Sequence, residues 1–528
     1  MRLATWLPLI SILGVLNACV PDKDPASVVS PPAYPQGLEG LMEARPPQSM
    51  ELKDGDSLTL TAGPVKKVLQ GREVRMLGYN GSIPGPEIRV AQGAQVTIRL
   101  RNRTGFPTTL HPHGVRLDYR NDGSPDFSQA PIEDGGEFTY RFKFPDPGTY
   151  WYHSHVREDA GQQLGLYGTF VVVPKDSAYW NPVDREVSLV LSDVLVDSAG
   201  PVPFHDGKVD HVLMGRFGKI FLVNGDTAFH VDVKRNEYVR FYVTNAASAR
   251  VFNFVLNRTY MKVVGSDNGK YERSYLSAGE LIAPGERMVF EAMFKDTGVV
   301  ELLQETPTRL FTIGTVHVLP DSAESGYRAA YTVEDTAREV MGDIDAFRPY
   351  FDKAPDKEIL LTGIMEGMGM PGMGMPMAKA GAAAKVSASE DGGSPKGVEW
   401  VDTMGAMNSL STIENTHWVI RDMHTMEENH NIFWHFNLGD KVLIRVHSDS
   451  KAIHSMPHPL HFHGQRFLVV NVDGVRNTDL AWKDIYLVGA GSTVDLLLDA
   501  GNPGGWMAHC HIAEHLEDMM MFYFHIGD

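Results

Sequence analysis

Four His-x-His pairs are the feature that most restricts how this chain can fold. It has 21 histidines among 528 residues, a frequency at which about one such pair would arise by chance. In a β-strand, residues i and i+2 point to the same face, so each pair directs two imidazoles the same way. The sequence therefore predicts four strands whose histidines can surround metal ions. The pairs are His111 and His113, His153 and His155, His461 and His463, and His509 and His511.

The spacing of the pairs indicates that two separate parts of the chain supply equivalent strands. The first two pairs lie 42 residues apart, and the last two lie 48 residues apart. One pair alone is an ordinary surface feature, but eight imidazoles offered in this manner are typical of a polynuclear metal site. We therefore expect the first and last parts of the chain to face each other and to enclose a metal cluster at their interface.

The rest of the chain has the pattern of short β-strands separated by turns. Apolar and polar residues alternate with period two at 95–100, 238–243 and 441–446, and Gly, Pro, Asn and Asp recur between such runs. This pattern favours antiparallel β-sandwiches, and helical patterning is scarce. The predicted fold class is all-β.

An internal repeat and the length of the chain predict three domains. Asn80-Gly81 opens a stretch that ends near Asn102, Asn224-Gly225 opens a similar one that ends near Asn245, and residues 439–446 resemble the strand portion of both. A chain of 528 residues is also long for a single core. We place the domains at residues 49–175, 176–320 and 356–528, joined by a linker at 321–355.

The N-terminus predicts export. There are two cysteines, Cys19 and Cys510, so a disulfide framework is absent. Arg2 and the apolar run 7–16 are typical of a secretory signal. The segment Leu16-Asn17-Ala18-Cys19 resembles a bacterial lipobox, which implies cleavage before Cys19 and a lipid anchor on its thiol; the alternative is a plain signal with an incidental cysteine. We expect a lipoprotein-type signal peptide at 1–19, a tether at 20–48 and a periplasmic location.

The charge of the chain restricts its partners. The net charge is -18, which disfavours nucleic acid and anionic membranes. Apart from the N-terminus, no apolar run reaches membrane-spanning length. We expect a monomer that contacts a membrane through its N-terminal anchor.

Cys510 predicts a second kind of metal site. It lies between the two histidines of the last pair and therefore points to the opposite face of the strand, where it should bind a different metal ion. His515 and Met520 follow it, and His458 lies upstream. Two imidazoles, a thiolate and a weak axial thioether are the ligands of blue-copper electron-transfer sites.

These motifs resemble the four copper signatures of the multicopper oxidases, over essentially the whole mature chain. The resemblance implies three consecutive cupredoxin-like, Greek-key β-sandwich domains and four copper ions, with dioxygen as the electron acceptor. The motifs are His111-Pro112-His113-Gly114, Trp151-Tyr152-His153-Ser154-His155, His458-Pro459-Leu460-His461-Phe462-His463-Gly464, and the segment from His509-Cys510-His511 to Met520.

The resemblance also implies which residues hold each copper ion. The blue copper would be held by His458, Cys510, His515 and Met520, with Cys510 passing electrons to a trinuclear cluster. The single copper of the cluster would be held by His111 and His461. Its coupled pair would be held by His113, His153, His155, His463, His509 and His511. Some relatives lose these ligands and act as binding or assembly proteins, but none of the twelve is missing here. The alternative of a copper nitrite reductase does not fit this chain, because those enzymes are shorter and arrange their copper sites differently.

Reduction of dioxygen to water consumes four protons, which metal-bound histidines do not supply. Asp122, nine residues after His113, matches a carboxylate that is associated with proton delivery in related enzymes. The alternative is an aspartate that merely initiates a turn before glycine. A second carboxylate commonly follows the cysteine motif, but the matching residue here is Leu516, with Glu514 and Glu517 nearby.

A methionine-rich insertion at about residues 364–396 favours Cu(I) as the substrate, to be oxidised to Cu(II). Gly and Pro disfavour a regular element there. Core packing does not explain methionines that alternate with these residues, whereas soft thioethers prefer Cu(I); an inert linker is the alternative. Copper oxidases of Gram-negative bacteria, which the chain resembles, often carry a comparable insertion. The candidate ligands are Met365, Met368, Met370, Met373, Met375 and Met377.

His454 and Met456 precede the blue-copper motif and are further candidates for a Cu(I) substrate site. In the copper-efflux oxidases that the chain resembles, a methionine at the position of Met456 binds Cu(I) beside an aspartate, which is replaced here by His454. Met423, His424 and Met426 are weaker candidates. The alternative functions are a laccase-like oxidase of phenols and aromatic amines, and a copper-sequestering surface protein with secondary oxidase activity.

Overall fold

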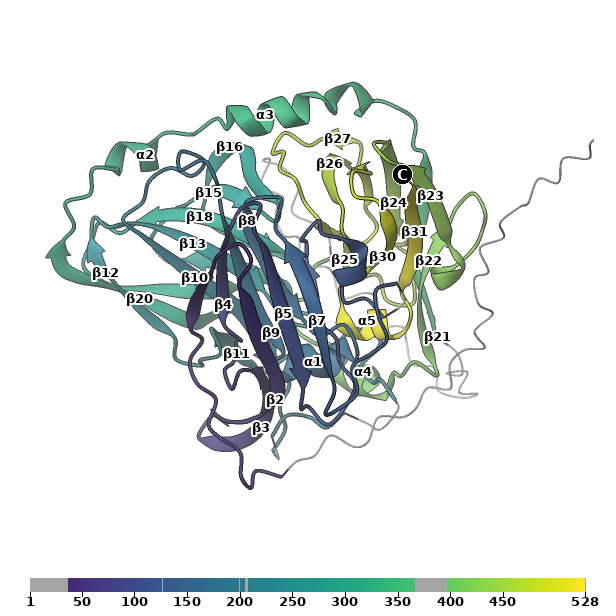
Figure 1. Ribbon diagram of the computed structural model, residues 1–528, viewed down its shortest axis with the longest axis horizontal. Coiled ribbons are helices and arrows are strands. Elements are labelled where there is room, and N and C mark those ends of the chain that lie inside the picture. Colours follow the sequence, from purple (N-terminus) through teal and green to yellow (C-terminus); the bar gives the residue numbers. More distant parts are fainter. Residues whose placement is uncertain (1–36, 126, 199, 205–207, 366–396, 528) are drawn as a thin grey trace, which may run out of the picture.

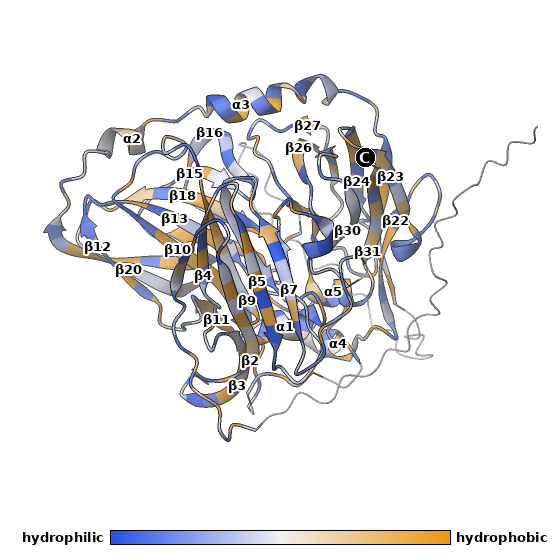
Figure 2. Cartoon of the chain, in the orientation of Figure 1, coloured by the Kyte–Doolittle hydropathy of each residue, from blue (hydrophilic) through white to orange (hydrophobic). Residues whose placement is uncertain are grey.

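The computed structural model describes residues 37–125, 127–198, 200–204, 208–365 and 397–527, which form six β-sheets paired into three β-sandwiches (Figure 1). Every second side chain is buried along β5 (Gln95–Asn102), as period-two patterning requires. Figure 2 shows apolar and polar residues alternating along many strands. The all-β prediction is confirmed.

The first sandwich contains the first two histidine pairs. Leu60, Ile98, Phe142 and Phe170 belong to the apolar core between its sheets. One sheet has the order β3 (Arg72–Tyr79), β2 (Ser57–Leu69), β5 and β7 (Glu137–Lys143). The other has the order β1 (Ser49–Leu52), β4 (Glu87–Ala91), β9 (Tyr167–Val173), β8 (Gly148–His153) and β6 (His111–His113).

The second sandwich, teal in Figure 1, contains none of the predicted copper ligands. Its core includes Phe241, Phe254 and Phe290. One sheet has the order β11 (Ile220–Val223), β10 (Arg185–Val194), β13 (Tyr238–Asn245), β18 (Arg287–Met293), β15 (Met261–Ser266) and β16 (Gly269–Ser277). The other has the order β12 (His230–Arg235), β20 (Leu310–Ser322), β19 (Gly298–Glu305), β14 (Phe252–Leu256) and β17 (Glu280–Ile282).

The third sandwich, green to yellow in Figure 1, contains the last two histidine pairs. Its core includes Leu460, Leu496, Phe522 and Cys510. One sheet has the order β22 (Thr416–Asp422), β21 (Lys357–Met365), β24 (Lys441–Ser448), β29 (Thr493–Asp499), β26 (Arg466–Val472) and β27 (Val475–Arg476). The other has the order β23 (Phe433–Asn437), β31 (Met521–Gly527), β30 (Gly504–Cys510), β25 (His458–Phe462) and β28 (Ile485–Val488).

The internal repeat is visible in two asparagines that end equivalent strands. The Asn102 side chain donates to the carbonyl oxygens of Phe106 and Ile132 at 2.7 and 2.8 Å. The Asn245 side chain donates to those of Arg250 and Ile282, both at 2.8 Å. The same polar side chain thus holds the same pair of loops in the first two sandwiches. The domain boundaries themselves stay predictions.

The predicted linker contains helices that the sequence analysis missed. Short helices α2 (Arg328–Thr332), α3 (Arg338–Asp345) and η2 (Arg348–Tyr350) lie between the second and third sandwiches in sequence, and α3 crosses the top of the view in Figure 1. Val340 and Ile344 of α3 pack against Leu443 and Trp482 of the third sandwich. The helix is too short for its periodicity to stand out in the sequence.

The remaining helices are short. They are α1 (Glu158–Leu164), η1 (Tyr119–Asn121), α4 (Gly405–Leu410), η3 (Asn429–Asn431) and α5 (Ala513–Glu517). Helix α1 follows the second histidine pair, α5 follows the fourth, and the two contact each other. In the described part of the chain, we find no helix with the length and apolarity that a membrane crossing requires.

Candidate metal centres

Strand pairing brings each histidine pair beside another. Strands β6 and β8 are antiparallel neighbours with His111 opposite His153. Strands β25 and β30 are antiparallel neighbours with His461 opposite His509. The equivalent spacing seen in the sequence therefore reflects equivalent neighbouring strands in the first and third sandwiches.

The two sets of histidines meet in one buried cluster. The ring of His113 stacks on that of His461 with centroids 3.8 Å apart, and the ring of His111 stacks on that of His463 at 4.1 Å. All eight imidazoles are buried. The stacked rings come from different sandwiches, so the cluster lies where the first and third sandwiches face each other, as the spacing predicts.

Oxygen acceptors fix the tautomers of several of these rings. His111 Nδ1 donates to the Asp122 carbonyl oxygen and His461 Nδ1 to that of Asp484, both at 2.7 Å. His153 and His509 donate from Nδ1 to the carbonyl oxygens of the residues that follow them, at 2.8 and 2.9 Å. A carbonyl oxygen can only accept, so each Nδ1 carries the hydrogen and each Nε2 has a free lone pair.

These lone pairs face one another in a manner that fits a metal cation. His463 Nδ1 donates to Asp122 Oδ2 at 2.8 Å, which leaves His463 Nε2 bare. This atom lies 3.0 Å from the bare Nε2 of His509 and 3.3 Å from His155 Nε2. Two lone pairs repel at this distance unless a cation accepts both. Imidazole nitrogens are suitable copper ligands, so the donor set fits the metal that the sequence predicts.

Burial keeps the rings in the neutral form that metal binding requires. It lowers their pKa, and neighbouring imidazoles add to the effect at most of them, because a charge in this site would be poorly solvated. This holds for His113, His153, His155, His461, His463, His509 and His511.

Asp122 contacts the cluster from the loop that follows β6. Its carboxylate accepts from His463, as described above, and its Oδ1 lies 3.4 Å from His111 Nδ1. Burial alone would raise the pKa of Asp122, but His111 and His463 outweigh burial and lower it below the usual range of a carboxyl. Gly123, at φ 78°, continues the turn. Asp122 is therefore both a turn residue and a direct neighbour of two candidate ligands.

Cys510 lies on the other face of β30, in a second buried cluster. Its Sγ is 3.6 Å from Nδ1 of both His458 and His515. Burial raises the pKa of the Cys510 thiol, so this site is apolar, and a bound cation would be needed to favour the thiolate. The ring of Trp418 stacks on His515 with centroids 4.5 Å apart.

Met520 is placed beside this second cluster by the backbone. Its amide donates to the His515 carbonyl oxygen, and its carbonyl oxygen accepts from the Cys510 amide, both at 3.0 Å. Its side chain is fully buried in the same core as Cys510. Met519 is 41% exposed, and Met521 packs into a different apolar cluster with Leu516. These burials favour Met520 over its neighbours as an axial ligand.

The candidate substrate ligands are only partly brought together. Met456 is buried in the core that contains Cys510, and Met365 packs against that core. His454 Nε2 lies 3.1 Å from Glu399 Oε1, a carboxylate that the sequence analysis missed because it lies far away in the chain. Met423, His424 and Met426 are exposed, in the turn after β22. Met368, Met370, Met373, Met375 and Met377 lie outside the described residues.

A buried acidic cluster lies between helices α1 and α5. Glu158 Oε1 is 3.4 Å from His155 Nε2, and the Glu158 amide donates to Glu517 Oε1 at 2.8 Å. Burial raises the pKa of Glu517 to about 7 and that of Glu514 to about 8. Glu514 and Glu517 were candidates from the sequence, whereas Glu158, which contacts a histidine of the first sandwich, was not predicted.

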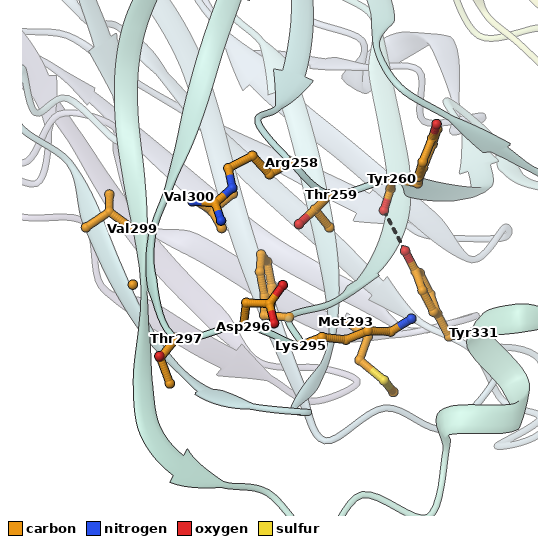
Figure 3. A pocket seen from close by; sticks show the side chains of 12 residues that line it. Arg258, Thr259, Tyr260, Met293, Lys295, Asp296, Thr297, Val299, Val300 and Tyr331 are labelled. Carbon is orange, nitrogen blue, oxygen red and sulfur yellow. Dashed lines mark hydrogen bonds between the residues drawn. The ribbon is translucent and has the colours of Figure 1, made fainter.

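A surface pocket of about 150 Å³ lies in the second sandwich, away from these ligands in the fold (Figure 3). Arg258, Lys295 and Asp296 line it, and at one edge the Tyr331 hydroxyl donates to the Tyr260 carbonyl oxygen at 2.9 Å. None of the predicted copper ligands lines this pocket.

The chain is similar to known copper oxidases. Residues 63–177 and 403–528 each match a family model described as multicopper oxidase. The multicopper oxidase MmcO of Mycobacterium tuberculosis is 28% identical over 487 residues, which are 87% of this chain and 84% of that protein. Copper resistance protein A of Pseudomonas syringae pv. tomato is 37% identical over 145 residues, which are 28% of this chain and 23% of that protein.

Solved structures share the whole fold. A multicopper oxidase from Campylobacter jejuni, described as a metallo-oxidase, superimposes with a TM-score of 0.67 at 23% identity, over 93% of this chain and 98% of its own. The McoA multicopper oxidase of Aquifex aeolicus superimposes with a TM-score of 0.67 at 22% identity, over 92% of this chain and all of its own. The family-model matches at both ends of the sequence and the similarity to MmcO along most of the chain lead to one conclusion: this chain belongs to the multicopper oxidase family, oxidoreductases that use dioxygen as the electron acceptor.

Proposed function

We propose that this enzyme binds four copper ions and oxidises Cu(I) to Cu(II), in a role in copper detoxification. The observation that carries the four-copper proposal is the pair of buried donor clusters on opposite faces of β30, one with eight imidazoles and one with a thiolate. When bound, copper supplies the one-electron steps that join substrate oxidation to the four-electron reduction of dioxygen to water. The chain holds the donors, excludes water from them and connects the two sites.

The contacts support a division of the ligands among the copper ions. We assign His458, Cys510 and His515, with axial Met520, to the blue copper. His111 and His461, whose Nε2 atoms have no hydrogen-bond partner among the described residues, are assigned to the single copper of the cluster. The coupled pair is assigned to two sets of three rings, since the members of each set lie in mutual contact. These sets are His155, His463 and His509, and His113, His153 and His511.

Cys510 connects the two sites through covalent bonds. Its neighbours in the chain, His509 and His511, belong to the eight-histidine cluster, and its own side chain belongs to the other cluster. An electron that arrives at the thiolate therefore has a short covalent path to either ring. This arrangement supports a role for Cys510 in electron transfer as well as in metal binding.

Asp122 is proposed to deliver protons to the cluster. It is a buried carboxylate that contacts His463 and His111. Because the imidazoles would be occupied by metal, a neighbouring carboxylate is a suitable group to pass on a proton.

The proposed Cu(I) site lies beside the blue-copper cluster. It consists of the Met456 thioether and His454, with Glu399 as a newly identified neighbour. Thioether and imidazole ligands suit Cu(I), and the carboxylate favours the cation electrostatically. The name copper resistance protein A, carried by several similar proteins, agrees with this substrate. Capture of Cu(I) by the methionine-rich insertion stays a prediction from sequence.

Oxidation of phenols is the second candidate function. Laccase-15 of Oryza sativa is 29% identical over 232 residues, and a structure from Ochrobactrum described as a laccase-like multicopper oxidase superimposes with a TM-score of 0.66. Export and lipid anchoring at Cys19 are also proposals. They rest on residues 1–19, which lie outside the described part of the chain.

Replacement of Cys510 by Ser should separate the two sites spectroscopically. We expect Cys510→Ser to lose the blue absorption of the copper-loaded protein, because the thiolate–copper bond is its source. As the matched variant, His461→Ala should keep the blue absorption. Its rate of oxygen consumption should fall further than the about 10–100-fold that is typical when a hydrogen-bond partner of a metal ligand is removed, because a ligand itself is lost. Absorption spectra and oxygen-electrode rates check both results. Unchanged colour in Cys510→Ser would contradict the assignment.

Replacement of Asp122 by Asn should slow the oxygen half-reaction alone. The amide oxygen of Asn can still accept from His463, but the side chain can no longer take up and release a proton. We expect reoxidation by dioxygen to slow by about 100-fold, while reduction by substrate stays within about twofold. Stopped-flow measurement of the two half-reactions checks this, with Asp118→Asn in the same loop as the control. Equal slowing of both would mean that Asp122 is structural.

Replacement of Met456 by Leu should distinguish the two substrates. Leucine keeps the volume but loses the sulfur, so kcat/KM for Cu(I) should fall by about tenfold, or about 1.4 kcal/mol in transition-state stabilisation. The rate with a phenol should change by less than about twofold. Glu399→Gln should also weaken Cu(I) oxidation, and Met261→Leu in the core of the second sandwich is the control. An unchanged Cu(I) rate, with phenols turned over faster than Cu(I), would instead support a laccase.

A further inference from the structure

The second sandwich reaches the histidine cluster although it supplies none of the proposed ligands. The loop before β18 carries Gly285, and a Cβ placed at Gly285 would lie 3.0 Å from Cδ2 of His511. Two residues later, Arg287 is completely buried at the start of β18. This loop therefore packs directly against a proposed ligand of the coupled copper pair.

The Arg287 guanidinium joins all three sandwiches. Nη1 donates to Asp484 Oδ1 at 2.7 Å, and Nη2 donates to Asp484 Oδ2, which makes a two-pronged pair with the third sandwich. Nε donates to the Thr149 carbonyl oxygen of β8 in the first sandwich at 3.2 Å. Nη1 also donates to the Gly285 carbonyl oxygen of its own loop at 3.2 Å. A planar fork held in this way fixes the plane of the carboxylate.

Asp484 in turn contacts two proposed ligands, one in the first sandwich and one in the third. Its Oδ1 accepts from His113 Nε2 at 3.1 Å, and its carbonyl oxygen accepts from His461 Nδ1 at 2.7 Å. The carboxylate therefore favours the His113 tautomer with hydrogen on Nε2. That tautomer leaves Nδ1 bare, and Nδ1 faces His511 Nε2 at 3.2 Å.

His113 is inverted relative to other rings of the cluster. His111, His153, His461 and His509 donate from Nδ1 to a main-chain carbonyl oxygen and thus direct Nε2 inward. His113 instead directs Nδ1 inward, and the acceptor that holds its Nε2 is the Asp484 side chain. A side chain rotates more freely than a main-chain carbonyl, so the orientation of the His113 ring depends on the groups that fix Asp484.

We propose that Arg287 is a positioning residue for the coupled copper pair: it fixes the Asp484 carboxylate, which holds His113 with Nδ1 directed at the metal. This inference rests on the proposed copper assignment. Such a role for Arg287 would make the second sandwich part of the metal site, since groups that hydrogen-bond to a metal-bound imidazole orient its ring and select its tautomer. Lysine keeps the charge but offers a single point of donation, so it cannot fix the carboxylate plane.

The test compares Arg287→Lys with Arg250→Lys in copper-loaded full-length protein. Arg250 is the matched control because it is also a buried arginine of the second sandwich, paired with Asp193 and with main-chain oxygens, and it contacts none of the proposed ligands. Total copper is measured together with the copper detected by electron paramagnetic resonance, since the two spins of a coupled pair cancel. The blue absorption reports the Cys510 site separately.

We expect Arg287→Lys to keep its blue absorption while the detectable fraction of its copper rises or its total copper falls. Reoxidation by dioxygen should slow by about 10–100-fold. Arg250→Lys should match the wild type in its spectra, whatever its thermal stability. An unchanged spectrum in Arg287→Lys, or the same change in both variants, would overturn the proposal and leave Arg287 as a contact between sandwiches.

Asp484→Asn supplies a second arm that keeps the Arg287 contacts with Thr149 and Gly285. In either orientation its amide nitrogen would face an Arg287 donor, so the pairing that fixes the side chain is lost. The hold on His113 should then weaken, and the coupled pair should change as in Arg287→Lys. A wild-type signal in this variant would also overturn the proposal. Failure of the proposed function is distinguishable from failure of this inference, because in that case the wild-type protein itself would show no coupled copper pair.

Discussion

Two bare imidazole nitrogens, on His463 and His509, face each other at 3.0 Å in the buried core between the first and third sandwiches. Each is bare because the other nitrogen of its ring donates to a fixed oxygen, Asp122 Oδ2 or the Cys510 carbonyl. Without a cation this contact is repulsive. The arrangement therefore suits a metal cation that accepts both lone pairs, and the remainder of the fold holds such rings in place.

The oxygen acceptors around the cluster explain why three sandwiches are needed. Strand pairing alone places His111 beside His153 and His461 beside His509. The carbonyl and carboxylate oxygens of Asp122 and Asp484 then connect rings across the interface between sandwiches. The second sandwich completes this frame through Arg287, whose burial is compensated by its pairing with Asp484.

The parts of the site that follow from local spacing could be predicted from the sequence. The alternation of side chains along a strand predicts that His509 and His511 share one face and Cys510 takes the other, and the structure has this arrangement. Period-two patterning likewise predicted the β-sandwiches. The choice of Met520 over Met519 and Met521 came from resemblance, and the different burials of these side chains favour it.

The parts that depend on long-range packing could not be predicted. Glu399, Asp484 and Arg287 lie in segments with no repeated spacing, and each acquires its partner only when distant parts of the chain meet. Helix α3 was missed because it is short, and its apolar face becomes evident only against the third sandwich.

Anomalous X-ray scattering at the copper absorption edge, from crystals of the copper-loaded protein, tests the central claim most directly. The proposed assignment predicts four peaks, one bonded to Cys510 and three among the eight imidazoles, with one of the three bonded to both His463 and His509. No peak at the Nε2 atoms of His463 and His509 would contradict it, because the repulsive contact between them would then need another explanation.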